Sequence, residues 1–266
     1  MSYRLFALVS NPFSPPPLKT RFAQRREREF LYLKEVDILI AATQNTRAGT
    51  RNAALAMLIF SQALQPVEIG WLRWRDVDFN KNTLQVIRNR TPTSHSQALT
   101  VNRQCLSLAE VIILKQLQLV STTDWLWQSE RRQRLSERSL HHIIAHAGIE
   151  AQLSFPVHPY MLRRTGLYYR AALLLQPLGL SLRQCCLLWN LYFTSTSLPP
   201  QEEIEYRAIL RQQEEGFLNA LEKIKAFTGI TAYDNLIDYL LGAFLLFPHL
   251  QEIPQNYWLA PLQWRL

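Results

Sequence analysis

The side chains in this sequence that are best suited to chemistry are its arginines, because 23 of the 29 basic residues are arginine. A guanidinium group is planar, keeps its charge at physiological pH and presents a rigid fork of N–H donors that matches phosphate oxygens. The excess of arginine therefore favours contact with a phosphate-bearing polyanion. A solvated basic surface would have the same composition, so the placement of the charge matters as well.

Charge is distributed unevenly along the chain. Residues 1–200 carry 24 basic and 12 acidic side chains, a net charge of +12, whereas residues 201–266 carry five basic and nine acidic side chains, a net charge of −4. Together they give the net charge of +8 over 266 residues. A basic body followed by an acidic segment indicates a polyanion-binding surface on the first part and a different task for the second.

Metal and cofactor chemistry have little support in the sequence. The cysteines Cys105, Cys185 and Cys186 are odd in number and lack the spacing of metal ligands, so we expect free thiols in a reducing compartment. His142 and His146 lie four residues apart on an expected helix, but no third ligand accompanies them. We therefore expect no metal site and no cofactor.

Hydrophobic periodicity predicts a mainly α-helical protein with one small antiparallel β-sheet. Residues 83–88 alternate and are rich in β-branched side chains, which is typical of a strand, and a second strand near 98–102 would complete a hairpin. Ser107 and Ser136 are suited to cap helices, and Gly148 to end one. A further short strand is expected over 125–127, and helices are predicted over 33–43, 51–64, 66–74, 107–120, 136–148, 158–175, 181–191, 201–227 and 231–247.

The chain divides into three parts by composition. Residues 1–30 contain four prolines and a run of arginines, which predicts an extended basic N-terminal arm. Residues 31–200 would form one domain that holds the sheet and most of the helices. After the prolines at its end, residues 201–266 are predicted to form an acidic helical C-terminal extension.

No segment has the length and composition of a membrane span. The best apolar runs, 107–120 and 236–247, are shorter than the roughly 20 residues that cross a bilayer. No early stretch has the three regions of a signal peptide. We therefore expect a cytoplasmic, nucleoid-associated protein that does not bind membranes.

Several stretches of the sequence resemble the catalytic domain of the tyrosine recombinases, the phage integrase family. RNAALAMLIFSQALQPVEIGWLRWRDVDF (51–79) is similar to the family segment in which an aliphatic helix precedes a Gly-Leu-Arg turn, a Glu and Leu-x-Trp-x-Asp. YLKEVDILIAAT (32–43) resembles the opening helix. LSERSLHHIIAHAGIEAQL (135–153) and VHPYMLRRTGLYYRA (157–171) resemble the family's His-Pro-His-x-Leu-Arg-His segment.

This resemblance covers about residues 31–198. The fimbrial-switch invertases are the most similar in style, because they too lack a separate N-terminal DNA-clamping domain. The resemblance implies the fold of the DNA breaking–rejoining enzymes, followed in this chain by a helical C-terminal extension.

The resemblance also implies a specific chemistry. In the family a tyrosine hydroxyl attacks a DNA phosphate, two arginines and a His or Trp stabilise charge on the phosphate oxygens, and a lysine and a histidine handle protons. Gln65 matches the first arginine and Tyr160 matches the catalytic histidine, whereas Arg163 matches the second arginine and Glu68 is retained.

The remaining catalytic positions are also altered. The hairpin carries Arg88 and Arg90 in place of the lysine, and an arginine is a poor proton donor but a good phosphate clamp. Trp189, Asn190 or Leu191 stands where a later histidine belongs. The tyrosine position falls near 198–200, which offers no phenolic hydroxyl. By this resemblance the catalytic set is degenerate.

The resemblance places one group of arginines at the DNA. The loop and helix start around residue 134 face DNA in the resembled fold. The predicted DNA-binding residues are Arg88, Arg90, Arg131, Arg132, Arg134, Arg138, Arg163 and Arg164. Four tryptophans near these segments are expected to serve core or near-surface packing, namely Trp71, Trp74, Trp125 and Trp127.

We therefore predict a DNA-binding protein that is not an enzyme. Its partner would be double-stranded DNA, and its role that of a transcriptional regulator or an accessory factor in DNA rearrangement. Residues 201–266 would carry a dimer or protein-partner surface.

Two alternatives stay open. A displaced nucleophile, Tyr192 or Tyr206, would leave an active site-specific recombinase. A protein-interaction scaffold without DNA binding would instead bury Arg88, Arg90 and Arg163 in internal salt bridges.

Overall fold

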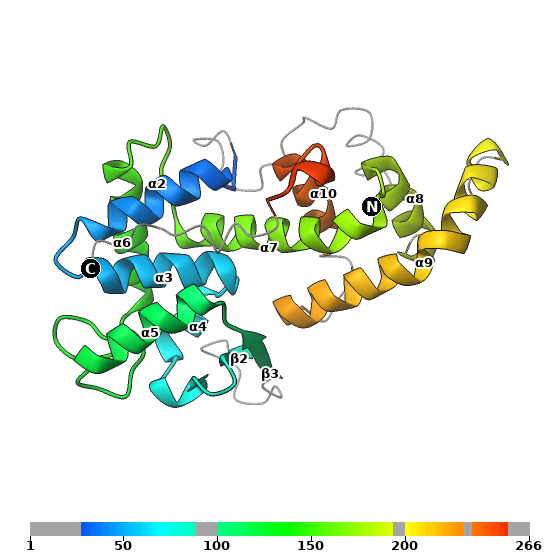
Figure 1. The fold of residues 1–266 in the computed structure, drawn as a ribbon. Helices are drawn as coiled ribbons and strands as arrows, with labels where there is room; N and C mark the ends of the chain where they lie inside the picture. Colours follow the sequence, from blue (N-terminus) through cyan, green and yellow to red (C-terminus); the bar gives the residue numbers. More distant parts are fainter. Residues whose placement is uncertain (1–27, 89–99, 194–199, 231–232, 234–235, 255–266) are drawn as a thin grey trace. The chain divides into compact units, whose positions relative to one another are not determined.

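The computed structural model describes residues 28–88, 100–193, 200–230, 233 and 236–254 (Figure 1). Its internal contacts divide the chain into two compact units, with the boundary between Gly166 and Leu167. We call the described residues up to 166 the N-terminal unit and those from 167 the C-terminal unit. This division differs from the predicted boundary near residue 200, which stays a prediction, as does the basic arm, most of which lies outside the described residues.

The N-terminal unit is built around one buried helix, α3. Eleven of its 13 residues are buried, because an Ala/Leu-rich sequence is apolar on every side and can be covered all round. Helices α2 and α5 pack against it, and α6 packs against α2 and α4 (Figure 1). The helices of this unit are α2 (Leu33–Gln44), α3 (Gly49–Ser61), α4 (Pro66–Trp71), α5 (Leu108–Val120), α6 (Glu137–Glu150) and the beginning of α7 (Pro159–Leu175).

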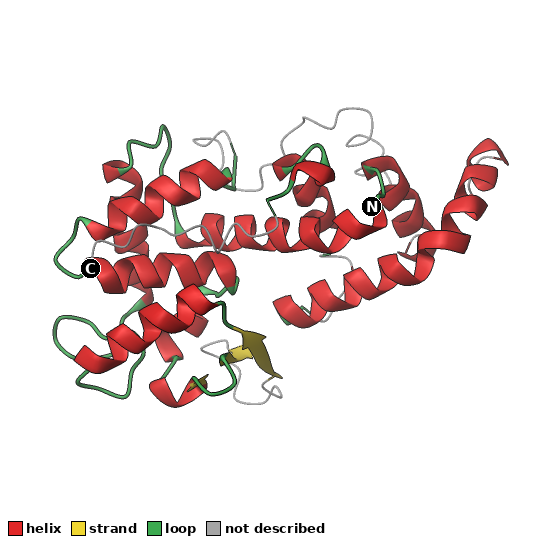
Figure 2. Cartoon of the chain, in the orientation of Figure 1, coloured by secondary structure: helices red, strands yellow, loops and turns green. Residues whose placement is uncertain are grey.

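A three-stranded antiparallel sheet lies in the same unit (Figure 2). Its order is β1 (Val77–Asp78), β2 (Thr83–Arg88) and β3 (Thr100–Cys105), and Thr83 pairs with Cys105 while Arg88 pairs with Thr100. The prediction of a mainly helical fold with a small antiparallel sheet is confirmed. The sequence did not indicate β1, because two residues are too few to show alternation. The segment between β2 and β3, which includes Arg90, lies outside the described residues.

The ends of the helices follow local capping chemistry. The side chains of Ser107 and Ser136 accept hydrogen bonds from backbone N–H groups one turn into α5 and α6, which confirms both predicted N-caps. Gly148 does not end α6, contrary to the prediction, because the helix continues to Glu150. A Cβ at Gly148 would lie 2.9 Å from Val157 Cγ2, so this glycine permits close packing instead. The predicted strand at 125–127 is a single bridge between Trp125 and Arg73.

The C-terminal unit is helical. It contains the rest of α7, followed by α8 (Leu182–Phe193), α9 (Pro200–Thr228) and α10 (Ile237–Leu246). Helices α9 and α10 pack against α8. A Cβ at Gly242 of α10 would overlap the Tyr168 ring, so this glycine lets α10 approach α7 closely.

No single helix in the described ranges is both long enough and apolar enough to span a membrane. Helix α7 with its following 3₁₀ turn and α8 would reach that length and apolar composition only as a pair bent by 93°.

Close contact between α3 and α7 holds the N-terminal unit together. A Cβ at Gly166 would lie 1.8 Å from the backbone oxygen of Phe60, so the two helix backbones approach nearly to contact. The hydroxyl of Thr165, next to this glycine, accepts from Leu31 N–H and fixes the segment before α2 as well. The start of α7 therefore has a defined position against α3.

We predict that Gly166→Ala lowers the free energy of unfolding by about 2–3 kcal/mol, because neither backbone can yield to the added methyl group without separating the helices. Urea unfolding would measure the change. The control is Gly179→Asn. An added Cβ at Gly179 would have no neighbouring atom within 4 Å, and asparagine tolerates the left-handed conformation of this residue, whose φ is 61°. A Gly166→Ala protein as stable as this control would contradict the predicted helix contact.

Candidate functional site

The turn between α3 and α4 brings two arginine side chains to one backbone oxygen. Ala63 has a φ of 47°, in the left-handed region, so its carbonyl turns toward the arginines. Arg163 Nε donates to this oxygen at 2.9 Å and Arg88 Nη1 donates at 3.3 Å. Arg88 Nη2 also donates to the carbonyl of Gln62 at 3.0 Å. The turn is therefore held from a strand and from a helix at once.

Arg88 and Glu68 form a buried ion pair beside this turn. Arg88 Nη1 lies 2.6 Å from Glu68 Oε2, and the two side chains are 0% and 1% exposed. The same carboxylate oxygen accepts from the backbone N–H of Gln65, the N-cap residue of α4, at 2.7 Å. Burial raises the pKa of Glu68 and the charge of Arg88 opposes that rise. The two charges compensate each other, so the pair adds no net charge to the site.

A chain of amide side chains extends the pair into the core. Gln62 donates to the Glu110 carboxylate at 2.8 Å and to the Cys105 carbonyl at 3.2 Å. In the amide orientation that satisfies its neighbours, Gln104 donates to the Gln62 side chain at 2.7 Å and accepts from Arg88. Sequence reasoning missed Gln62, Gln104 and Glu110. No local pattern distinguishes a buried glutamine from a surface one, although Gln104 lies on a strand and Glu110 at a helix start.

The position of Arg88 corrects its predicted role. Its guanidinium was expected at the DNA, but the side chain is fully buried and bound to Glu68 and to two carbonyls. Strand β2 points this side chain toward the core, where burial of an arginine requires a carboxylate partner. In this structure Arg88 is a structural group. The scaffold hypothesis required such burial for Arg163 as well, but Arg163 is only half-buried and its charge acts on Glu68 without a direct hydrogen bond among the described residues.

Arg163, which matches the second catalytic arginine of the resembled family, keeps an accessible cation. Its side chain is half-buried, and only Nε is engaged, so Nη1 and Nη2 have no hydrogen-bond partner in the described part of the chain. One turn earlier on α7, Tyr160 is 44% exposed. Burial and the nearby Glu137 raise the pKa of Tyr160, while Arg163 opposes the rise. The phenol therefore stays protonated at neutral pH and can donate a hydrogen bond.

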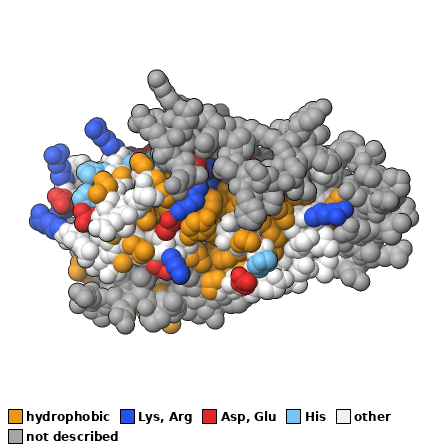
Figure 3. Space-filling view, turned by 90° about the horizontal axis from the view of Figure 1, so that it is seen from above, with side chains coloured by type: hydrophobic (Ala, Val, Ile, Leu, Met, Phe, Trp, Pro, Cys, Tyr) orange, Lys and Arg blue, Asp and Glu red, His pale blue; other side chains and the backbone are white. Residues whose placement is uncertain are grey.

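Other predicted positions vary in their accessibility. His158 Nε2 lies 3.2 Å from the Glu29 carboxylate, which suits the structural role that the resemblance gave it. Arg164 Nη1 lies 4.0 Å from the same carboxylate and its side chain is 41% exposed. The exposed predicted contacts are Arg131, Arg132, Arg134 and Arg138. Basic side chains on the face seen in Figure 3 stand apart rather than forming one continuous patch.

The last two matched positions lie in the C-terminal unit. Trp189 is 3% exposed and packs on Phe193, with ring centroids 4.5 Å apart. Asn190 is half-buried. The hydroxyl of Tyr192 donates to the Glu214 carboxylate, within this unit. Nothing is described of the Tyr206 side chain.

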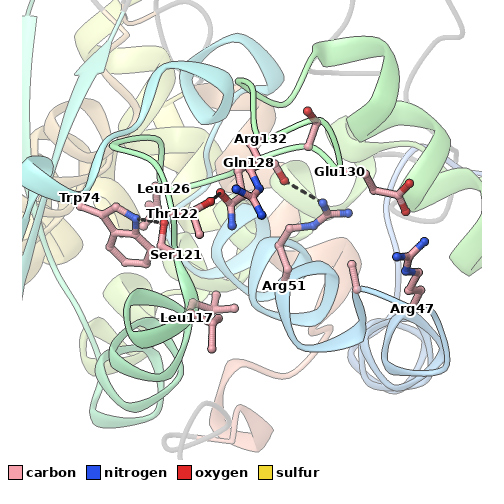
Figure 4. A pocket seen from close by; sticks show the side chains of 13 residues that line it. Arg47, Arg51, Trp74, Leu117, Ser121, Thr122, Leu126, Gln128, Glu130 and Arg132 are labelled. Carbon is pink, nitrogen blue, oxygen red and sulfur yellow. Dashed lines mark hydrogen bonds between the residues drawn. The ribbon is translucent and has the colours of Figure 1, made fainter.

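A separate basic pocket of about 380 Å³ lies in the N-terminal unit. It is lined by Arg47, Arg51 and Arg132, with Trp74 and Leu117 on its apolar side (Figure 4). Arg51 holds the pocket wall, because its Nη1 donates to the Gln128 carbonyl at 2.8 Å. Burial lowers the pKa of Arg51. No group of three or more His, Cys, Asp or Glu side chains that could bind a metal ion occurs among the described residues.

We predict that Arg88→Met lowers the free energy of unfolding by about 3–5 kcal/mol, because it leaves the buried Glu68 carboxylate without its cation. The double variant Arg88→Met/Glu68→Gln should recover at least about 2 kcal/mol of this loss. Urea unfolding of both single variants and the double variant measures the coupling. Lys81→Met, which breaks an exposed 3.8 Å pair with Asp78, is the control and should cost less than about 1 kcal/mol. Additive effects of Arg88→Met and Glu68→Gln would refute the buried pair.

Comparisons with known proteins agree with the fold described above. The model of the phage integrase family matches residues 29–169. The type 1 fimbriae regulatory protein FimB of Escherichia coli is 27% identical over 143 residues, which are 54% of this chain and 71% of FimB.

Solved structures share the fold. XerA recombinase has a TM-score of 0.52 and 17% identity, with 85% of this chain and 62% of XerA covered. The Tn1549 transposon integrase, solved in complex with a circular intermediate DNA, has a TM-score of 0.52 and 8% identity, with 89% of this chain and 71% of the integrase covered. The chain thus spans less than two thirds of XerA.

These likenesses overturn the prediction that the chain is not an enzyme. The matched family and the structural neighbours are recombinases, and altered residue types at matched positions do not show inactivation. The prediction treated each family position as irreplaceable, although Tyr160 can donate a hydrogen bond where the family has histidine. The family model covers just over half of the 266 residues, and the chain therefore belongs to the phage integrase family, the tyrosine recombinases.

Proposed function

We propose that this protein binds duplex DNA in a recombination process and that Arg163 contacts a backbone phosphate there. The observation that carries the proposal is the guanidinium of Arg163, in which Nε alone is hydrogen-bonded within the described part of the chain, while Nη1 and Nη2 have no partner there. Two parallel N–H donors on one planar group match two oxygens of a phosphate. Family membership supports DNA as the partner.

The charge balance around Arg163 favours an anionic ligand. Glu68 and Arg88 neutralise each other, so Arg163 provides the net positive charge of this cluster. Tyr160 supplies a phenolic donor one helical turn away, and Gln65 supplies a neutral amide. A phosphate would thus meet one cation and two neutral donors, which is a weaker set than two arginines but still a favourable one.

Exposed arginines of the 131–138 segment complete the proposed contact surface. Arg131, Arg132 and Arg138 have exposed side chains, and none of them pairs with a carboxylate among the described residues. Such side chains can neutralise phosphates and release counterions, which provides affinity without sequence readout. Arg134 and Arg164 belong to the same proposed set, with Arg164 partly neutralised by Glu29.

The proposed biological role is regulation through DNA rearrangement or transcription. Its support is the name of the relative FimB, a fimbriae regulatory protein. The acidic segment 201–266 would then provide the dimer or partner surface.

Strand cleavage by Tyr192 is a second candidate function. The Tyr192 hydroxyl donates to the Glu214 carboxylate, and a phenol bound to a carboxylate is suited to lose its proton as it attacks a phosphate. The phosphotyrosine bond would form as the sugar oxygen leaves the same phosphorus.

For duplex binding, we predict that a triple Arg131/Arg132/Arg138→Ala variant lowers the slope of log affinity against log salt by about 2–3, because each lost phosphate contact removes about 0.9. Arg163→Ala should lower the slope by about 1. Fluorescence anisotropy with a labelled duplex between about 50 and 200 mM salt measures both.

The matched control for the triple variant removes three exposed lysines, Lys34, Lys115 and Lys223, and should change the slope by less than half as much. No duplex binding by the wild type, binding without salt dependence, or equal effects of both triple variants would reject the proposal.

For strand cleavage, we predict that a nicked suicide duplex traps a covalent protein–DNA adduct that survives denaturation. Tyr192→Phe should abolish the adduct, because the attacking hydroxyl is gone, and Tyr206→Phe should keep it. Denaturing gel electrophoresis measures the trapped fraction. An adduct that persists in Tyr192→Phe, or no adduct with a duplex that the wild type binds, would reject this second candidate while leaving duplex binding intact.

A further inference from the structure

Four side chains of the N-terminal unit form a surface ladder in which arginines flank two tryptophans. The Arg134 guanidinium lies 4.1 Å from the ring centroid of Trp71, and the Arg73 guanidinium lies 4.3 Å from that of Trp125. The two indole rings meet edge to face with centroids 6.1 Å apart. We call these four residues the Trp/Arg ladder.

The Trp/Arg ladder is accessible to a ligand. Trp71 is 42% exposed, Arg134 is exposed, and Trp125 and Arg73 are half-buried. Neither guanidinium forms an ion pair with a carboxylate in the described part of the chain. The sequence-based expectation for these tryptophans was packing, and it holds for Trp127, which is 1% exposed. Trp71 fits the near-surface part of that expectation and leaves a large aromatic side chain at the protein surface.

Backbone hydrogen bonds hold the ladder in place before any ligand arrives. Trp74 N–H donates to Asp124 O and Leu126 N–H donates to Leu72 O, both at 3.0 Å, which fixes Arg73 opposite Trp125. Leu135 N–H donates to Trp127 O at 3.0 Å and fixes the segment that carries Arg134.

Glycine in α4 allows the last of these segments to come close. A Cβ at Gly70 would lie 3.1 Å from Leu135 O, so the absence of a side chain there lets Arg134 reach across Trp71. A ligand would therefore meet a preorganised surface and lose little side-chain freedom in binding.

The relative strengths of cation–π contacts and base stacking indicate which ligand suits the Trp/Arg ladder. Stacking of a nucleobase on an aromatic side chain contributes more to binding than an exposed cation–π contact does. A base can therefore displace the guanidinium of Arg134 from the indole face at a net gain, and the released guanidinium can then bind the phosphate next to that base.

Paired and unpaired nucleic acid differ in what they offer to such a surface. In a duplex the base faces are covered by stacking, so only phosphates and base edges are accessible. A single strand offers π faces and phosphates close together, which suits two indole rings with a guanidinium group on either side. An acidic peptide would satisfy the guanidinium groups but provide no ring for the indoles.

We propose that the Trp/Arg ladder binds unpaired bases of single-stranded DNA. This inference depends on the proposed function only for its biological use, since strand exchange between duplexes requires base pairs to open. The ladder would hold the opened strand while Arg131, Arg132 and Arg138 hold duplex phosphates. Binding of a single strand is measured separately from binding of a duplex, so either proposal can fail alone.

The test is fluorescence anisotropy of the full chain with a labelled 12-nucleotide oligo-dT strand and, separately, a labelled 12-base-pair duplex. We predict that Trp71→Ala weakens oligo-dT binding about 10-fold, the loss of one stacked base, and changes duplex binding less than about twofold. Trp125→Ala should weaken oligo-dT binding as well. Trp71→Phe, which keeps an aromatic face and guards against a folding defect, should restore most of the affinity.

The control variant is Arg75→Ala, which removes an exposed arginine near the ladder but outside it, and it should change oligo-dT binding less than about twofold. The inference is overturned if the wild type does not bind oligo-dT, if Trp71→Ala binds it as well as the wild type, or if Arg75→Ala and Trp71→Ala weaken it equally. A competition experiment with the wild type provides a further test. The inference is also overturned if polyglutamate displaces labelled oligo-dT as well as unlabelled oligo-dT does, since an acidic protein would then be the better occupant.

Discussion

The buried ion pair between Glu68 and Arg88 is the interaction on which the arrangement of the site depends. Water does not solvate these two buried charges, so each is stabilised by the other. Removal of either residue would leave the remaining charge unpaired in the core, at a cost of several kcal/mol. The pair links strand β2 to the beginning of α4, and through the carbonyls of Gln62 and Ala63 it also fixes the turn between α3 and α4. Arg163 binds the same Ala63 carbonyl, so the position of the accessible cation depends on a turn that the buried pair holds. The buried Arg88 thus helps to position Arg163, the arginine that we propose contacts DNA.

This division of roles is the basis of the proposal that the altered residues bind a phosphate. Gln65 is the N-cap residue of α4, and its backbone N–H holds Glu68 in the capping position, although its side chain brings no charge. Tyr160 brings a protonated donor to the position of a histidine. The net charge near the turn then comes from Arg163, and the exposed arginines around residue 134 add to it from a second segment. The Trp/Arg ladder extends this surface with aromatic faces, which suits a ligand whose bases are not always paired.

Sequence reasoning predicted the fold well because its signals are local. The strand over 83–88, the serine caps and most helix boundaries follow from alternation and side-chain hydrogen bonding within a few residues. The roles of the site residues were harder to predict from the sequence. The burial of Arg88 depends on Glu68, 20 residues away, and on the direction in which β2 points the Arg88 side chain. The role of Gly148 was misjudged for the same reason, since its partner Val157 lies beyond the helix. The prediction that the chain is not an enzyme failed on a different ground: it inferred loss of activity from residue types, which family membership contradicts.

Arginine modification with phenylglyoxal, mapped by mass spectrometry with and without duplex DNA, tests the central claim most directly. The buried pair predicts that Arg88 stays unmodified in the folded protein under both conditions, whereas Arg163 is modified in free protein and protected when duplex is bound. Rapid modification of Arg88 that DNA suppresses, together with an Arg163 whose reactivity DNA leaves unchanged, would contradict the assignment of one arginine to the core and the other to the phosphate.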